Sequence, residues 1–160
     1  MNGQKIVYET NNFLVFLPNM PHIPREDGGH LVITTKEKIL DRTGLNPTQA
    51  IECMRLTMLV GEAMVKGLKK QNINIERINY QENGNWAYLR HEVPFFHIHL
   101  YGRTKDSKSQ IWGEALNLPD PDSGYYSSFD KLTNEDIFFI QEEIKKLEKT
   151  DKYNLKNWTL

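Results

Sequence analysis

The stretch FFHIHLYGR, residues 95–103, decides how this chain can be interpreted. Its bulky apolar residues predict a β-strand, and strand side chains alternate between the two faces of a sheet. His97 and His99 therefore share one face, and the opposite face carries the core residues Phe96, Ile98 and Leu100. The two histidines stand roughly 6.5 to 7 Å apart at their Cα atoms, close enough to contact one phosphate or one metal ion. A buried imidazole without a partner costs about 1 to 3 kcal/mol, so the pair indicates a functional site rather than core filling.

The sequence around this strand predicts an α+β fold, in which an antiparallel sheet carries a long helix and a C-terminal helix follows. Asn46 and Pro47 are typical of a helix start, and Thr133 can cap a second helix over residues 134–149. The segment 18–29 contains three prolines and two glycines, which predicts a loop. Short runs rich in β-branched and aromatic residues predict strands at residues 6–9, 13–17, 30–34, 73–81 and 94–101.

Size and charge limit the classes of protein to consider. With 160 residues we expect one domain, residues 1–160, with a core at about 6–103 and an extension with a helix at 104–160. The net charge is −1 and the chain has no sustained run of basic residues that could bind a phosphate backbone, so we expect no duplex nucleic acid as a partner. Without an apolar segment of roughly 18 residues or a leader-like N-terminus, we expect a cytoplasmic protein with no membrane partner. Cys53, the single cysteine, fits a helical apolar pattern and is expected to be buried.

Two segments together resemble the histidine triad superfamily of nucleotide hydrolases and nucleotidyl transferases. The strand at residues 95–103 resembles the family motif of histidines alternating with apolar residues, followed by a small residue and an arginine. Upstream, GHLVITTK at residues 29–36 resembles the family segment in which a small residue and a histidine precede an apolar strand and a lysine. The likeness covers about residues 6–103 and leaves the tail unmatched.

The resemblance implies roles for individual residues. His97 matches the nucleophile that attacks the α-phosphorus and forms a nucleotidyl-histidine, and His99 would contact the same phosphate. His30 matches the upstream histidine that lies against the catalytic pair. Asn19 is the candidate for holding the ribose hydroxyls. The expected substrate is a small nucleotide conjugate, namely a nucleoside phosphoramidate or a dinucleoside polyphosphate, and family members are commonly homodimers.

The chain also departs from the family pattern. Phe95 stands where the first motif histidine would be, so only its main-chain carbonyl remains to accept a hydrogen bond from His97. Arg90 and His91 replace a Gly-Gln pair, and both can donate hydrogen bonds to an anion. Arg103, at the strand end, is a candidate for the cationic rim of the phosphate site.

Three functions remain open from the sequence. In the first, the protein releases a nucleoside monophosphate through His97 and needs no cofactor. In the second, His97, His99 and His30, with or without His91, bind zinc for a metal-dependent hydrolysis. In the third, Phe95 has reduced turnover and the protein only binds or senses nucleotides. Trp86 is interpreted as a packing residue, and His22 as an exposed loop residue.

Overall fold

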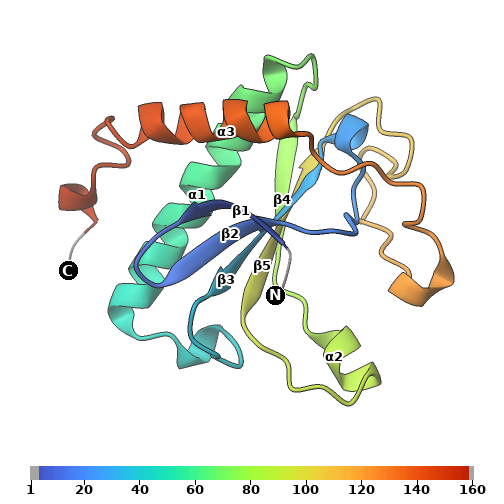
Figure 1. The fold of residues 1–160 in the computed structure, drawn as a ribbon, viewed down its shortest axis with the longest axis horizontal. Coiled ribbons are helices and arrows are strands. Elements are labelled where there is room, and N and C mark those ends of the chain that lie inside the picture. The colour runs from blue at the N-terminus through green and yellow to red at the C-terminus, as the bar shows by residue number, and fades with distance from the viewer. Residues whose placement is uncertain (1–3, 159–160) are drawn as a thin grey trace.

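The computed structural model describes residues 4–158, without the side chain of Asn85, and confirms the α+β fold. Its sheet has five antiparallel strands in the order β1-β2-β3-β5-β4 (Figure 1). The strands are β1 (Lys5–Glu9), β2 (Phe13–Leu17), β3 (His30–Thr35), β4 (Arg77–Gln81) and β5 (His97–Arg103). The α-helices are α1 (Pro47–Lys69), α2 (Asn85–Leu89) and α3 (Asn134–Leu147).

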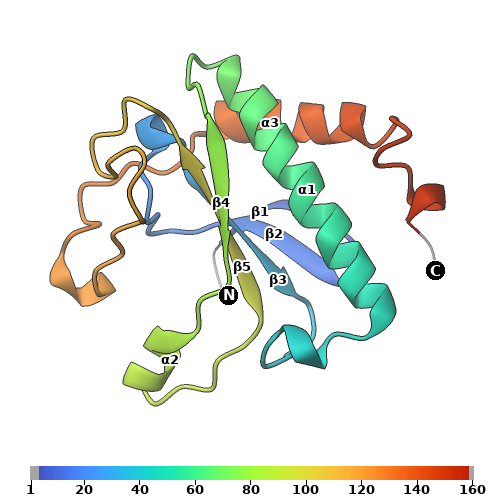
Figure 2. The ribbon, with the colours of Figure 1, turned by 180° about the vertical axis from the view of Figure 1, so that it is seen from behind.

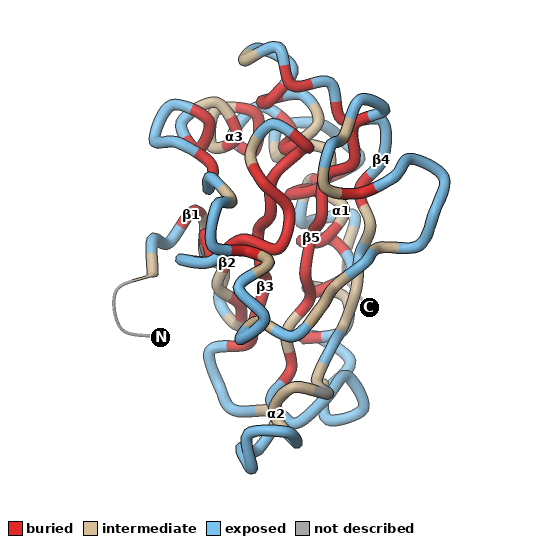
Figure 3. The backbone as a smooth tube through the Cα atoms, turned by 90° about the vertical axis from the view of Figure 1, so that its right-hand side faces the viewer, coloured by how far each residue is buried: buried red, intermediate tan, exposed pale blue. Residues whose placement is uncertain are grey.

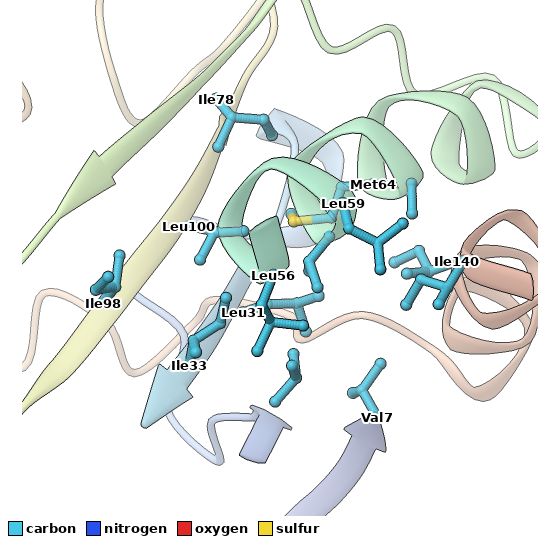
Figure 4. Packing of buried hydrophobic residues seen from close by; sticks show 14 of the residues in the cluster. Val7, Leu31, Ile33, Leu56, Leu59, Met64, Ile78, Ile98, Leu100 and Ile140 are labelled. Carbon is cyan, nitrogen blue, oxygen red and sulfur yellow. The ribbon is translucent and has the colours of Figure 1, made fainter. Parts of the chain in front are cut away.

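Helix α1 covers one face of the sheet (Figure 2). It begins where the sequence predicts, because the Asn46 side chain accepts a hydrogen bond from the Gln49 backbone and the Gln49 side chain accepts one from the Asn46 backbone. Leu56 and Leu59 of the helix pack against Leu31, Ile33 and neighbouring side chains of the sheet, all fully buried (Figure 4). This layer holds β3 and β5 rigidly and leaves their opposite face for other contacts.

Helix α3 packs across α1, so the C-terminal extension contributes to the same core (Figure 1). Ile137, Ile140 and Ile144 are buried in the hydrophobic cluster that the sheet and α1 form. A Cβ on Gly67 of α1 would lie 2.9 Å from the Ile140 backbone nitrogen, so the absence of a side chain there allows the helices to approach closely. Among residues 4–158, no helix is long and apolar enough to cross a membrane.

Most predicted elements agree with the structure, and two do not. The strand expected at residues 73–81 begins only at Arg77, although Ile73 and Ile75 are buried as the apolar pattern suggests. The strand expected from residue 94 begins at His97, because the Phe96 backbone nitrogen donates to the Ile39 carbonyl rather than to a strand. The short helix α2 follows β4 and has no counterpart among the predicted elements.

Two loops lie against the ends of β3 and β5. The backbone nitrogens of Gly102 and Thr104 donate to the carbonyls of Gly29 and Asp27, which fastens the loop at residues 18–29 to the end of β5. The second loop is the segment that follows β5, residues 104–120. The Asp27 carboxylate fastens it by accepting hydrogen bonds from the backbone nitrogens of Lys108 and Ser109, at 3.0 and 2.8 Å. In Figure 3 the residues along β3 and β5 are mostly buried.

Candidate active site

The functional side chains come from the face of β3 and β5 that points away from α1. His30 of β3 is paired with Tyr101 of β5, and Thr34 is paired with His97, in antiparallel register. Since directly opposite residues point to the same face, His30, His97 and His99 gather on one surface. The sequence pattern placed His97 and His99 there, and the strand pairing adds His30.

Hydrogen bonds fix the positions of the protons on His30 and His99. The His22 backbone nitrogen donates to Nδ1 of His30 at 3.1 Å, so Nδ1 of His30 carries no proton. The proton of neutral His30 is then on Nε2, which lies 2.8 Å from Nδ1 of His99 and donates to it. His99 therefore carries its own proton on Nε2, where it is a hydrogen-bond donor.

Burial keeps these imidazoles neutral. It lowers the pKa of His22 to about 4 and that of His99 to about 2, and the neighbouring imidazoles, first among them His97, lower both further. Burial also lowers the pKa of His30 well below its ordinary value, with a second contribution from His99. At pH 7 the three rings are therefore hydrogen-bonding groups and not cations.

His97 is oriented by the main chain. Its Nδ1 lies 2.8 Å from the carbonyl oxygen of Phe95, the hydrogen bond that the sequence analysis expected in place of the missing imidazole. Because a carbonyl oxygen only accepts, Nδ1 carries the proton and Nε2 keeps its lone pair. The ring is partly exposed, and its centroid lies 4.8 Å from that of His99. The His97 ring is thus accessible and held in the tautomer that leaves Nε2 free.

A pocket of about 440 Å³, here called the histidine pocket, opens over these residues. Its volume lies within the usual range for small-molecule sites. His22, His97 and His99 line it, whereas His30 lies behind His99. The rest of the wall combines apolar side chains with a few polar ones, including Met20, Trp86, Val93, Leu118, Asn83, Arg90 and Glu92.

The other predicted binding residues are distributed differently. Arg90 lines the histidine pocket and lies 3.6 Å from Asp122 in an exposed ion pair. His91 is exposed and is not among the pocket residues. Its backbone has a φ of 56°, which directs it differently from its neighbours in the chain. Asn19 is exposed and lines a separate cavity with Lys5 and other residues, so the expected ribose contact is not at the histidine pocket.

The Arg103 side chain stabilises the second loop and is not part of the pocket rim. It is 4% exposed, and its guanidinium donates to the Ile111 carbonyl at 2.8 Å and, more weakly, to that of Glu114. The sequence reading of Arg103 as a phosphate contact fails for a physical reason. The strand continues to residue 103, so the side chain is covered by the loop that follows.

The sequence interpretation of His22 is wrong. The residue is only 8% exposed, and its ring centroid lies 4.8 Å from that of His30 and 5.3 Å from that of His99. The ring also packs near Trp86 and Tyr126, at 5.1 and 5.0 Å. No periodic pattern marks His22, because its place depends on how the proline-rich loop folds back over β5. The only signal in the chain is its position eight residues before His30.

Three of the buried histidines, His22, His30 and His99, also form a group that could bind zinc. The possible ligand nitrogens of His22, His30 and His99 all lie within 4.8 Å of one another, and the three residues are buried. This group differs from the predicted set because it contains His22 in place of His97. Nitrogens around a tetrahedral zinc ion are roughly 3.3 Å apart, whereas those of His30 and His99 are 2.8 Å apart. A small opening of this pair would fit the ion.

Comparison with solved structures identifies the fold. No protein-family model and no curated protein matches the chain. A hypothetical histidine triad nucleotide-binding protein from Sulfolobus tokodaii is 17% identical, with a TM-score of 0.61 over 94% of this chain and 90% of that chain. A zinc-bound histidine triad family protein from Mycobacterium smegmatis is 19% identical, with a TM-score of 0.54 over 89% of this chain and 85% of that one. A Hit-like protein from Bartonella henselae, described as involved in cell-cycle regulation and bound to an unknown ligand, is 16% identical, with a TM-score of 0.56 over 88% and 86%. The chain therefore has the histidine triad fold.

Proposed function

We propose that this protein is a histidine triad nucleotide hydrolase or nucleotidyl transferase that acts at the α-phosphate of a nucleotide conjugate. The observation that carries the proposal is His97, whose Nδ1 is held by the Phe95 carbonyl at 2.8 Å while the ring faces the histidine pocket. The fold shared with histidine triad proteins supports the same reading, and one of them is described as nucleotide-binding. Nucleoside phosphoramidates and dinucleoside polyphosphates are the proposed substrate classes.

The proposed reaction has two steps at one phosphorus atom. Nε2 of His97 attacks the α-phosphorus, a P–N bond forms, and the bond to the leaving group breaks as that group takes up a proton from solvent. Water then attacks the phosphorus of the nucleotidyl-His97 intermediate, a P–O bond forms, the P–N bond breaks, and the water proton passes to solvent as the nucleoside monophosphate leaves. If another hydroxyl replaces water, the nucleotidyl group is transferred to that acceptor. The Nε2–H of His99 donates to a phosphate oxygen on which negative charge increases in both steps.

The first test follows AMP release from a panel of AMP phosphoramidates and diadenosine polyphosphates. We expect release by the wild type and a loss of at least about 10³-fold in His97→Ala, because the nucleophile of the first step is absent and the intermediate of the second step cannot form. Acid-quenched reactions with labelled AMP conjugates should contain a labelled protein adduct in the wild type alone. Release that persists in His97→Ala would contradict the proposal. AMP binding without release would instead favour a nucleotide-sensing protein.

A second candidate function is zinc-dependent hydrolysis, and the group of His22, His30 and His99 is the observation that favours it. His22, His30 and His99 would hold the zinc ion, which would supply an acidified water for the hydrolysis. Metal content of the purified protein tests this candidate. Stoichiometric zinc that is lost in His22→Ala and His30→Ala but retained in His97→Ala would support it.

A homodimer also remains part of the proposal, by analogy with the histidine triad fold. Light scattering on the purified chain decides between one and two copies. A monomer at all concentrations would refute this part alone, because the residues of the histidine pocket described above belong to one chain.

A further inference from the structure

His22 lies in the wall of the histidine pocket, although it belongs to a different segment from the motif strand. Besides the backbone hydrogen bonds to β5, two side-chain contacts hold the loop that carries His22. The His22 backbone nitrogen donates to His30 at 3.1 Å, and the Arg25 side chain forms two hydrogen bonds with Asp136, at 2.6 and 2.9 Å. Asp136 is fully buried at the start of α3, so this loop is fixed to the body of the protein. A ring held this firmly can act as a positioned chemical group.

Tyr101 determines which nitrogen of His22 carries a proton. The His22 ring and the Tyr101 hydroxyl form a hydrogen bond, in which Nδ1 of His22 lies 2.9 Å from the hydroxyl oxygen. Burial raises the pKa of Tyr101, so the hydroxyl keeps its proton. Tyr101 is fully buried, its O–H needs an acceptor, and among the described residues Nδ1 of His22 is the acceptor within hydrogen-bond distance. The hydroxyl proton is therefore directed to Nδ1 of His22. Nε2 of His22 then bears a hydrogen, and no other described side chain forms a hydrogen bond with it.

We propose that the Nε2–H of His22 is a second phosphate donor, which works beside the Nε2–H of His99. The proposal rests on the proposed nucleotidyl transfer at His97. The ring centroids of His22 and His99 are 5.3 Å apart, which lets two N–H groups reach different non-bridging oxygens of one phosphate. His22 is then a catalytic residue that the sequence motif does not contain.

The two donors act mainly on the transition state. Negative charge on the non-bridging oxygens increases as Nε2 of His97 attacks, and fixed donors stabilise that charge without reorganising. The effect of removing one donor should therefore fall on kcat more than on KM.

Two matched substitutions separate this role from packing. The side-chain nitrogen of glutamine can occupy the position of imidazole Nε2, whereas asparagine reaches only the position of Nδ1. We expect His22→Asn to lower kcat for AMP release by about 10²-fold and His22→Gln to retain most of the activity. The experiment uses metal-free protein whose folding has been verified by its thermal transition. Equal activity of the two folded variants would overturn the proposal.

Phosphorothioate substrates supply a readout that packing cannot change. Replacing one non-bridging oxygen of the α-phosphate by sulfur, a weak acceptor, gives two diastereomers. One diastereomer should react more slowly with the wild type because its sulfur faces His22, and this sensitivity should disappear in His22→Asn. Sensitivity that is unchanged in His22→Asn would contradict the assignment.

The outcomes distinguish this inference from the function on which it rests. If the wild type forms the His97 adduct and His22→Asn is fully active, only the role of His22 is refuted. If the wild type has no turnover, the proposed function fails, and calorimetry with AMP still tests the phosphate contact. Weaker AMP binding by His22→Asn than by His22→Gln then supports the contact, and equal binding refutes it.

Discussion

Phe95 contributes its main-chain carbonyl to the site, and this explains how the site can lack one imidazole. A carbonyl oxygen is present at every position, so the hydrogen bond to Nδ1 of His97 does not depend on the side chain at residue 95. The side chains around His97 have more specific tasks. His30 determines the tautomer of His99 because its own Nδ1 is occupied by the His22 backbone N–H.

Substitution of His30 should therefore reduce activity through His99. In His30→Ala, Nδ1 of His99 loses its donor, and we expect kcat for AMP release to fall by about 10- to 100-fold, which corresponds to a lost hydrogen bond of about 1 to 3 kcal/mol. His30→Gln should recover part of the loss, because its amide can donate to His99. Equal rates for the alanine and glutamine variants at matched folding would show that His30 only fills space.

At the scale of elements, the site depends on a close crossing between the loop at residues 18–29 and β5. Gly28 has a φ of 121°, and a Cβ on Gly28 would lie 2.5 Å from the Gly102 carbonyl carbon. A Cβ on Gly102 would in turn overlap the Gly28 carbonyl. The two glycines allow the loop to lie on the strand end, which places His22 beside His30.

Gly102→Ala tests the crossing. The added methyl group has no room, so we expect the free energy of unfolding to fall by about 1 to 3 kcal/mol, and the loop to become easier for proteases to cleave. Denaturant unfolding and limited proteolysis measure the two effects. Gly84→Ala is the matched control, because Gly84 has an ordinary φ of −143° and its added Cβ would meet only Pro94, at 3.7 Å. Identical losses for both variants would remove crowding as the cause.

Asp27→Asn tests the link between the two loops. The Asp27 carboxylate accepts from the backbone nitrogens of Lys108 and Ser109 and from the Ser109 hydroxyl. Burial raises its pKa, but these hydrogen bonds outweigh that effect and lower the pKa overall. An amide offers one acceptor oxygen in place of two, so we expect a loss of about 1 to 3 kcal/mol in the free energy of unfolding. A loss of less than 0.5 kcal/mol would mean that the loops hold together without it.

At the scale of the whole molecule, the cost of this site is the burial of three neutral imidazoles, those of His22, His30 and His99. Folding pays that cost through the packing of the sheet, α1 and α3 around one hydrophobic cluster. The consequence is a stability that depends on pH in a range where carboxylates do not titrate.

The metal-free protein should lose stability in mild acid. The folded pKa values of His22 and His99, about 4 and about 2, lie below the ordinary value of 6.5, and that of His30 is also lowered. The unfolded chain therefore binds more protons below pH 6.5, so stability is complete above that pH and falls progressively from there until the pH has passed below the folded values. If unfolding takes up three protons, the free energy of unfolding falls by as much as about 4 kcal/mol per pH unit.

Denaturant unfolding at pH 7.5, 6 and 5 measures this slope. His22→Asn removes one of the three groups and should reduce the slope by about a third. A free energy of unfolding that stays constant down to pH 4.5 would show that the imidazoles are not buried in the neutral form.

The sequence by itself determined the elements that depend on local patterns. The alternation in residues 95–103 predicted β5 and the shared face of His97 and His99, and the capping residues Asn46 and Thr133 predicted the starts of α1 and α3. It also predicted that Cys53 is buried. These features follow from side-chain periodicity and capping chemistry, which act over a few residues.

Only the tertiary structure decided which side chains meet at the pocket. His22 enters it, and Asn19 and His91 do not, because a proline-rich loop and a left-handed residue have no periodicity from which direction can be read. Arg103, a predicted phosphate contact, instead supports the loop that follows β5, because that loop folds back over the strand end. These placements depend on contacts that exist only once the sheet, the helices and both loops have packed together.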